Sequence, residues 1–456
     1  MKRRYSMFLF LLLLCVPVRV TFSQNTVVRG LIGSAETLFS NGVILSYNLV
    51  FGTVANDAGW ATPSVKGIKE NFSSPWQWEE TDGFKVNQIG HPIQGSVNFS
   101  AGRVNGFGFY ESTFFTLLGS STWESICESN HASMNDFITT ATGSLTVGEV
   151  LYRLYLEACA AGVPVPLAAL INPMAGFHRL VTGWEPPNNG RNLYHFQSHL
   201  GMVYAQTHYS LSDRNEELFS FNGLLGELGF DIIYGNPFEQ SSKIPFEQFE
   251  IAMAFGLDNG NYMNIRFISD GYLFSFSPVY TDTDMMSTGL SLHMDFVSVG
   301  KFDMYDATVD QFSNALNWTI KHQHLFSENT IFQTKFHAGF TFMGASEYYS
   351  TDRGRDLKNY GTGLNSKLFL TLENKKLGKL ETNLFGYVMW TYPGTSALSQ
   401  GSVFWLFTDI TYSRFISKHL SLGVTDFFAL EHGIFSGFPD TWKYNNAVKL
   451  FVAWNF

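Results

Sequence analysis

Charged residues are scarce in this chain of 456 residues. Asp, Glu, Lys and Arg together make up 15% of the sequence, whereas soluble globular domains average about 25%. Long apolar runs are missing as well. Beyond the amino-terminal segment no stretch approaches the ~18 uninterrupted apolar residues of a membrane-spanning helix, and mean hydropathy is close to zero, at −0.01. These two absences argue against a helical membrane protein.

Cysteine is also rare, and the usual cofactor motifs are absent. The chain has 3 cysteines and 12 scattered histidines. It has no cysteine-rich metal spacing, no His-Glu-x-x-His motif and no phosphate-binding glycine loop. We therefore expect no metal site and no cofactor. Cys127 and Cys159 could form a disulfide in an oxidising compartment or remain free thiols, and the sequence leaves both open.

Residues 1–23 have the organisation of a secretory signal peptide. A basic start, KRR, precedes an apolar run over residues 7–18, and cleavage is expected after residue 23. A lipoprotein signal that uses Cys15 is the alternative, but the preceding Leu14 is bulky where that signal has a small residue. Removing the four basic residues of this segment changes the formal charge from −10 to −14. An acidic, exported chain predicts no nucleic-acid partner.

Aromatic residues and glycine are abundant instead. Phe, Trp and Tyr account for 16% of the chain, and 41 residues are glycine. From about residue 193 onward, apolar and polar residues alternate in one segment after another. Residues 290–296 (LSLHMDF), for example, place Leu292 and Met294 on one face and His293 on the other. This alternation predicts strands that separate an apolar from a polar environment.

Twelve such segments can be delimited, and turn-like or polar stretches separate them. Many exceed ten residues, whereas strands of globular proteins average about 5–6 and a tilted membrane strand needs about 9–11. The expected strand cores are residues 194–209, 217–234, 246–257, 261–276, 287–298, 311–323, 329–343, 361–373, 379–392, 401–415, 418–431 and 444–456. Aromatic residues near strand ends, as at a membrane interface, are Trp390, Tyr392, Trp405, Tyr412, Trp442 and Tyr444.

A soluble β-sandwich would show the same alternation. Strand length, aromatic strand ends and the even count favour a closed barrel, because lipid offers no partner to an unpaired strand edge. We therefore predict a mainly β fold in which residues 193–456 form a transmembrane antiparallel β-barrel of about 12 strands. Such a barrel, exported through a signal peptide, belongs in the outer membrane of a Gram-negative bacterium, in contact with outer-membrane lipid.

The last nine residues, VKLFVAWNF, support this prediction. Their apolar side chains recur at every second position and end with Trp454 and Phe456, so they would face lipid, while Lys449 and Asn455 would face the lumen. A final strand with an aromatic carboxyl terminus resembles the signal by which outer-membrane barrels are passed to the barrel-assembly machinery. We expect Trp454 and Phe456 to serve as that assembly signal.

Two segments with different patterns precede the barrel. Residues 24–104 are mixed in composition, with Gly, Pro and Trp, and are expected to form an extended, loop-rich segment. Residues 105–183 have helical periodicity: Ser133 and Asp136 outline a capping box, and Pro173 is placed to begin a short last helix. We expect these helices to plug the barrel or to cap it from the periplasmic side.

The helix that follows Ser133 carries a polar stripe at spacings of three and four residues, so its members share one face. Glu149 and Arg153 form an i,i+4 pair in the favourable order. Because buried charges must be paired, we expect this face to dock against a polar barrel interior. A ligand site or substrate gate built from Asp136, Glu149 and Arg153 is the alternative. The stripe consists of Asn135, Thr139, Thr142, Thr146, Glu149 and Arg153.

Residues 90–112 (GHPIQGSVNFSAGRVNGFGFYES) and 133–154 (SMNDFITTATGSLTVGEVLYRL) resemble a family of unknown function, domain of unknown function 3943. The resemblance covers about residues 76–179, with a compatible strand-rich tail, and one glycine, Gly143, stands one residue later than the plainest spacing. It implies a bacterial envelope protein and no particular reaction, so it transfers no catalytic role. The matching positions are His91, Pro92, Gly95, Ser96, Ser133, Asn135, Asp136, Thr139, Gly143, Gly148, Glu149, Tyr152 and Arg153.

His91 and Ser96 are the one pair in this region with catalytic potential. With Asn98 they resemble the Asn–His–Ser set of outer-membrane lipid hydrolases, in which histidine is the base and serine the nucleophile. That set would have to lie on the barrel wall, and His91 precedes the barrel. We therefore expect His91 and Pro92 to fix a loop against the helices.

These observations favour a non-catalytic outer-membrane barrel that acts as a plugged or gated channel or maintains envelope integrity. One alternative is a lipid-active enzyme, a hydrolase or acyltransferase, that uses His91 and Ser96. Another is a docking module in which residues 105–183 bind a periplasmic protein partner and the barrel serves as an anchor.

Overall fold

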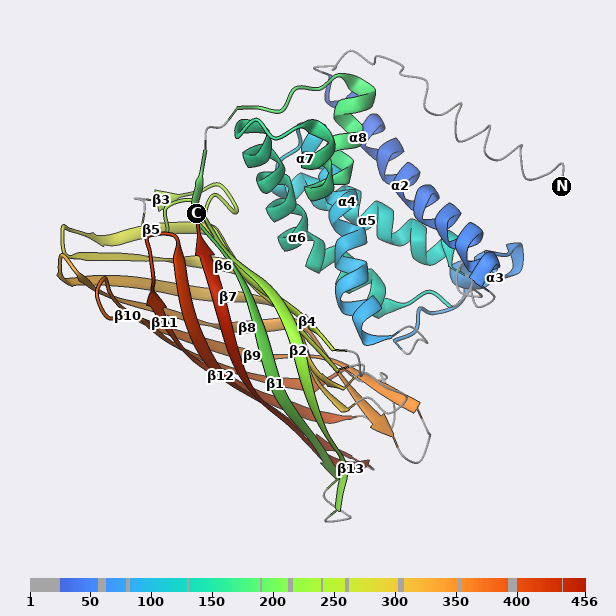
Figure 1. Ribbon diagram of the computed structural model, residues 1–456. Coiled ribbons are helices and arrows are strands. Elements are labelled where there is room, and N and C mark those ends of the chain that lie inside the picture. The colour runs from blue at the N-terminus through green and yellow to red at the C-terminus, as the bar shows by residue number, and fades with distance from the viewer. Residues whose placement is uncertain are drawn as a thin grey trace. The chain divides into compact units, whose positions relative to one another are not determined.

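The computed structural model divides the chain into two compact units (Figure 1). The helical unit comprises the residues up to Trp76 together with Gly90–Arg191, and the barrel unit comprises Gln77–Ile89 and Asn192–Phe456. The expected signal peptide lies outside the described residues. The structure describes residues 25–55, 63–78, 83–128, 131–188, 191–211, 216–238, 241–258, 262–301, 307–350, 355–392, 400–436 and 438–456.

The described part of the barrel unit contains twelve long strands, one for each predicted segment. Consecutive long strands pair antiparallel, and the pairing of β1 with β13 closes the sheet. A two-residue strand, β3, pairs with β5. The prediction of a closed antiparallel barrel of about 12 strands is therefore confirmed. The strands are β1 (Leu193–Leu211), β2 (Glu216–Tyr234), β3 (Ser241–Ser242), β4 (Phe249–Leu257), β5 (Tyr262–Tyr280), β6 (Asp284–Lys301), β7 (Ala307–Ser327), β8 (Thr330–Ser350), β9 (Arg355–Asn374), β10 (Gly378–Thr391), β11 (Gly401–Phe415), β12 (Leu420–Phe435) and β13 (Phe438–Asn455).

The period-2 pattern of the sequence gives each strand one lumenal and one outer face. On β13, Lys449 reaches Glu227 in the lumen, with Nζ and Oε1 3.0 Å apart. Its neighbours Val448 and Leu450 are 48% and 65% exposed on the outer wall. The outer wall is thus apolar and the lumen polar at this strand, as the alternation predicts.

The first and last strands define the two ends of the barrel. The near end is the one at which β1 begins and β13 finishes, and the far end is the opposite one. At the near end β1 begins, at Leu193, and β13 finishes, with Gln197 opposite Asn455. Because successive strands reverse direction, β1, β4, β6, β8, β10 and β12 all finish at the far end. Phe456 follows β13 at the near end, where its backbone N–H donates to Phe196.

A segment that precedes the barrel by a hundred residues packs against the far half of the barrel wall. The ring centroids of Phe84 and Phe296 are 5.7 Å apart. The Asn87 side-chain amide donates to the Tyr360 hydroxyl at 3.4 Å. These contacts bring residues 77–89 into the barrel unit, which the sequence did not predict.

Phe296 and Tyr360 belong to the outer face of the wall. Asp295, next to Phe296, binds Lys367 in the lumen, and Tyr360 is an odd number of residues from Lys367 on the same strand, so both rings point outward. Outward residues elsewhere are open, as Leu364 is at 51% exposure, whereas Phe296 and Tyr360 are 0% and 1% exposed. Phe84 and Asn87 therefore lie on the outside of the barrel.

Helices also occur in the described part of residues 24–104, which differs from the extended, loop-rich segment expected there. The helices are α2 (Thr26–Ala55), α3 (Val65–Ser73) and α4 (His91–Val104), with a π-helical turn, η1 (Val86–Gly90), before α4. Their many Ser, Asn and Gly residues have low helix propensity, and apolar residues occur on all sides of α2. Tertiary packing, and not local preference, makes these segments helical.

Within residues 105–183 helices stand where the periodicity predicted them. The Ser133 hydroxyl accepts a hydrogen bond from the Asp136 backbone N–H at 3.1 Å, and the last helix begins at Pro173. Within the described ranges, every helix falls short of the length and apolarity that a membrane span requires. The helices are α5 (Phe109–Thr122), the π-helical turn η2 (Trp123–Cys127), α6 (Met134–Ala160), α7 (Val165–Ile171) and α8 (Pro173–Thr182).

Candidate metal centre

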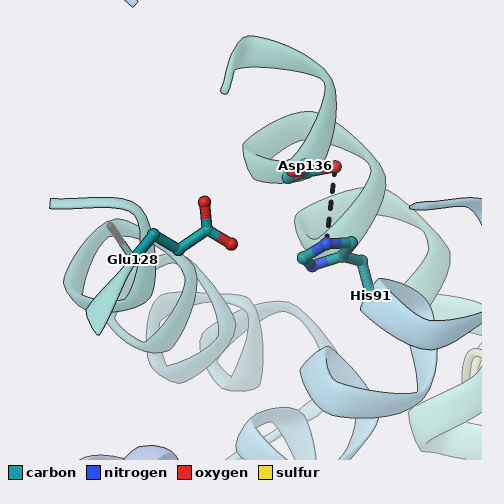
Figure 2. Close-up of side chains that lie close together, drawn as sticks. All are labelled: His91, Glu128 and Asp136. Carbon is teal, nitrogen blue, oxygen red and sulfur yellow. Dashed lines mark ion pairs between the residues drawn. The ribbon is translucent and has the colours of Figure 1, made fainter. Parts of the chain in front are cut away.

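Three acid or imidazole side chains meet inside the helical unit (Figure 2). His91 begins α4, Glu128 follows η2, and Asp136 lies in the first turn of α6. His91 Nε2 and Asp136 Oδ1 are 3.5 Å apart, and one potential ligand atom from each of the three residues lies within 4.8 Å of the others. The three residues are 5%, 6% and 0% exposed. They form what we call the His–acid cluster.

Local sequence features place the members of this cluster. Ser133 caps α6 and thereby fixes the first turn that carries Asp136. Gly95 allows α4 to approach α6 closely, because a Cβ there would lie 2.6 Å from the Thr140 carbonyl oxygen. His91, at the start of α4, is brought to the start of α6 by this close crossing.

Hydrogen bonds from neighbouring side chains orient the two carboxylates. The Trp123 indole N–H donates to Glu128 Oε1 at 2.8 Å. The Asn135 amide donates to Asp136 Oδ1 at 2.8 Å, and Thr139 in turn donates to Asn135 Oδ1 at 3.1 Å. Asn135, Asp136 and Thr139, which the sequence singled out as motif residues, therefore act together as one buried polar network.

One imidazole and two carboxylates are a donor set suited to a divalent cation. The sequence predicted no metal site, because its histidines are scattered and Glu128 belongs to no recognised motif. The pairing of His91 with Asp136 joins residues 45 positions apart. The one sequence feature that connects His91 with Asp136 is that both lie in the stretches that resemble the same family.

His91 and Ser96 are not brought together as a catalytic pair. Both lie on α4, five residues apart, so they project about 140° apart around the helix axis. The Ser96 hydroxyl donates to the Ile93 carbonyl at 2.6 Å, and His91 faces Asp136. His91 and Pro92 also start a helix and do not fix a loop.

Glu149 and Arg153 form a second buried charged group with Arg103 of α4. Glu149 is 0% exposed, and its two oxygens lie 2.8 Å from Arg153 Nε and 2.8 Å from Arg103 Nε. The guanidinium of Arg103 also covers the Tyr152 ring at 4.7 Å. The charges of the polar stripe are therefore paired within the helical unit, and their docking against the barrel interior stays a prediction. Cys127 and Cys159 are free thiols.

Inside the barrel, charged side chains from separated strands meet across the lumen. Lys367 on β9 contacts both carboxylate oxygens of Asp295 on β6 at 2.8 Å, although two strands lie between β9 and β6. The Tyr387 hydroxyl on β10 donates to the same carboxylate at 3.0 Å. All three side chains are at most 3% exposed.

Further lumenal contacts repeat this pattern. Lys321 on β7 binds Glu250 on β4 at 2.8 Å and Asp270 on β5 at 3.0 Å. Lys443 on β13, which is paired with Glu431 on the neighbouring strand β12 at 3.3 Å, donates across the lumen to the Glu347 backbone carbonyl on β8. In the described part of the barrel, the lumen is thus bridged by the strands' own side chains.

Trp405 is not one of the interfacial aromatic residues, although the sequence predicted it to be. It is 1% exposed, and its indole N–H donates to the Asp310 carbonyl across the lumen at 3.1 Å. The surrounding sequence, VFWLF, is apolar on both faces, so alternation could not assign its direction. Trp390 and Trp442, at 48% and 40% exposure, do lie on the outer wall.

Comparison with known proteins gives one family match and a set of distant structural likenesses. No curated protein matches the chain. A solved outer membrane channel, COG4313 from Pseudomonas putida F1, shares 9% identity with a TM-score of 0.32, over 60% of this chain and 100% of that one. The Pseudomonas putida toluene transporter TodX shares 7% identity with a TM-score of 0.23, over 57% and 89%. The translocator domain of the autotransporter NalP from Neisseria meningitidis shares 10% with a TM-score of 0.24, over 59% and 90%.

The TM-scores of these structural likenesses are all below 0.5. The family resemblance seen in the sequence is confirmed, and its match includes both sides of the His91–Asp136 contact. Residues 75–173 match the family described as Domain of unknown function (DUF3943), and in this chain the matched segment is followed by a closed antiparallel barrel of twelve long strands in the described residues.

Proposed function

We propose that this protein is a gated channel of the bacterial outer membrane, closed in the present conformation by its own lumenal side chains. The observation that carries the proposal is the set of buried ion pairs that span the lumen, above all Lys367 with Asp295. A barrel of about 8 strands is just filled by its side chains, and one of about 16 strands leaves an aqueous channel. A twelve-stranded barrel is intermediate, so long charged side chains have to bridge it.

The outer wall supports the membrane location. Its apolar side chains are exposed in large number, as on β13, while the charges of the same strands are paired in the lumen. Closure removes the unpaired edges that lipid cannot satisfy. Trp454, 41% exposed on this wall, and Phe456, 75% exposed, are available to the barrel-assembly machinery. We place the chain in outer-membrane lipid on these grounds.

The nature of the closing groups favours a gate over a permanent seal. A backbone plug has to be withdrawn as a unit, whereas a lysine that swings away from its carboxylate leaves both groups solvated in a wider lumen. Buried ion pairs contribute little net stability compared with packed apolar residues, so an inert anchor would have little use for them. Exchange of partners among these charges would open a path without unfolding a strand.

Solute uptake by liposomes tests the proposal. The first variant carries four serine substitutions. Lys367→Ser with Asp295→Ser removes a pair that bridges separated strands, and Lys443→Ser with Glu431→Ser removes the lysine that reaches the Glu347 carbonyl on β8 together with its partner on the neighbouring strand. Removing both members of each pair avoids leaving a buried charge alone. We expect wild-type liposomes to exclude small sugars and the four-site variant to admit them.

The matched control removes an ion pair that does not bridge the lumen. Lys379 and Glu381 are 3.0 Å apart on the same strand, β10, so Lys379→Ser with Glu381→Ser should leave permeability at the wild-type level. A four-site variant that folds, by its heat-modifiable gel mobility, and still excludes sugars would overturn the gate. In that case the barrel is a filled anchor.

A further inference from the structure

We propose that the His–acid cluster, His91, Glu128 and Asp136, binds one divalent transition-metal ion, with zinc as the reference ion. The separation of His91 Nε2 and Asp136 Oδ1 is 3.5 Å. Ligands at 2.0–2.1 Å from a tetrahedral zinc are roughly 3.4 Å apart. The same separation is longer than the 2.7–3.2 Å of a good N–H···O hydrogen bond. The separation therefore resembles one edge of a coordination tetrahedron more closely than a tight ion pair.

Charge balance points in the same direction. Two carboxylates at 6% and 0% exposure need compensation by positive charge. A divalent ion held by the imidazole and both carboxylates would match the charge of the two acids. The Trp123 and Asn135 hydrogen bonds to Glu128 and Asp136 are of the kind that orients metal-bound carboxylates.

Three protein ligands leave a fourth position of a tetrahedral ion open. In known zinc sites that arrangement accompanies a bound water or substrate, whereas structural sites use four protein ligands. The site thus has the ligand count of a reactive centre. It would lie between the two stretches that belong to the family match, and it is independent of the channel proposed for the barrel.

Isothermal titration of Zn²⁺ into the chelator-treated, refolded chain from Gln24 to Phe456 tests the site. We expect one ion per chain, and a loss of at least 100-fold in affinity in His91→Ala and in Asp136→Asn. The matched control is His131→Ala, because His131 is exposed in the same unit and should not change binding. Glu128→Gln provides a third ligand variant that keeps side-chain volume.

Circular dichroism of each variant establishes that the helices remain folded. Absence of zinc binding by the wild-type chain would overturn the proposal, and the cluster would then be an ion pair with a neighbouring carboxylate. Binding that survives His91→Ala and Asp136→Asn in folded protein would overturn it as well, since the ion would be adventitious.

A different observation leads to a second proposal: the helical unit lies in the hydrocarbon layer of the membrane. This inference rests on the membrane location of the barrel proposed above. Phe84 and Asn87 contact the lipid-facing wall in the far half of the barrel. β1 begins at the near end, at Leu193. The helical unit resumes at Gly90, directly after the wall-bound segment of Phe84 and Asn87 in the sequence.

The surface of the helices fits that environment. Among the nine charged residues of α4 to α8 and the links between them, only Glu111 is exposed; the others include the buried Glu124, Asp136 and Glu149. Between α2 and α5 a groove of about 470 Å³ is lined by Leu31 and Phe114 among others. Large apolar side chains that are exposed on α4 to α8 and η2 are Ile93, Tyr110, Phe114, Leu117, Ile126, Leu167, Leu170 and Leu180.

The interior of the unit is polar, which inverts the usual soluble arrangement. Ser40 donates to Asn98 Oδ1 at 2.8 Å, and Asn41 donates to the Gly119 carbonyl at 2.8 Å. Small residues permit such close approach between helices, and polar side chains that face one another across helices are typical of membrane bundles. Because the polar groups are turned inward, each helix has a modest average hydropathy although the surface of the unit is apolar.

Fluorophores on single cysteines, with quenchers fixed at the bilayer centre, test this proposal in proteoliposomes. In a Cys127→Ser, Cys159→Ser background, labels at Leu31→Cys and Phe114→Cys should be quenched several-fold. A label at Lys66→Cys should be quenched little, because the Lys66 side chain is 86% exposed on α3, which carries charges. This assay does not depend on the orientation of insertion.

Leu450→Cys on the outer barrel wall separates the two possible failures. If Leu450 is quenched while Leu31 and Phe114 match Lys66, the barrel is in lipid and the helical unit is not, which overturns this inference alone. If Leu450 is not quenched either, the membrane location itself fails.

Discussion

Lys367→Met should strongly destabilise the barrel. The ammonium of Lys367 contacts both oxygens of Asp295 at 2.8 Å, and the two residues are 1% and 0% exposed. Breaking a buried pair by removing one partner costs about 3–5 kcal/mol, because the other charge is left uncompensated. Tyr387 still donates one hydrogen bond to Asp295, so we expect a value near the lower limit, about 3 kcal/mol.

Urea unfolding of the barrel in lipid, followed by tryptophan fluorescence, measures this change. The companion variant, Lys367→Met with Asp295→Leu, removes both charges and should recover to within about 1 kcal/mol of wild type, because apolar replacements of buried pairs are often neutral. A single variant that loses less than about 1 kcal/mol, or a double variant less stable than the single one, would refute the assignment of a paired, desolvated lysine.

Three further changes probe the helical unit by thermal melts. Gly95→Ala should cost about 1–3 kcal/mol, because its Cβ would overlap the α6 backbone, whereas Gly42→Ala, with open space around it, should be neutral or stabilising; equal effects would disprove the tight α4–α6 crossing. Ser133→Ala should cost about 1 kcal/mol through loss of the α6 cap, and no change would show that the cap is dispensable. Glu149→Leu should destabilise more than Arg153→Leu, since Glu149 holds two arginines; the reverse order would contradict the pairing.

The barrel was predictable because its pattern is local. Lys449 and Val448 reveal their faces through simple alternation, and each turn interrupts it, so all twelve strands emerged from the sequence. Alternation of apolar and polar residues does not assign a direction to a side chain where both faces of the strand are apolar, as around Trp405. Contacts across the lumen, such as Lys367 with Asp295, join residues far apart in sequence and leave no local signal.

The helical unit was less predictable for a related reason. Its helices turn polar residues inward and apolar residues outward, and α2 is apolar on most sides, so the amphipathic period that marks a soluble helix is weak. The His–acid cluster depends on the close crossing at Gly95 and on the turn that places Glu128 after η2. The capping residue Ser133 was recognisable, because its bond to Asp136 spans three residues.

The closed lumen is the central claim, and thiol accessibility tests it most directly. Ala429 is 0% exposed inside the barrel and Ser417 is exposed at a turn, so Ala429→Cys and Ser417→Cys are compared in a chain without its native cysteines. With a small, membrane-impermeant thiol reagent, we predict rapid labelling of Ser417→Cys and none of Ala429→Cys. In the four-site serine variant, Ala429→Cys should become reactive. Labelling of both cysteines at similar rates in the otherwise native barrel would show that the lumen is open, and would contradict the account.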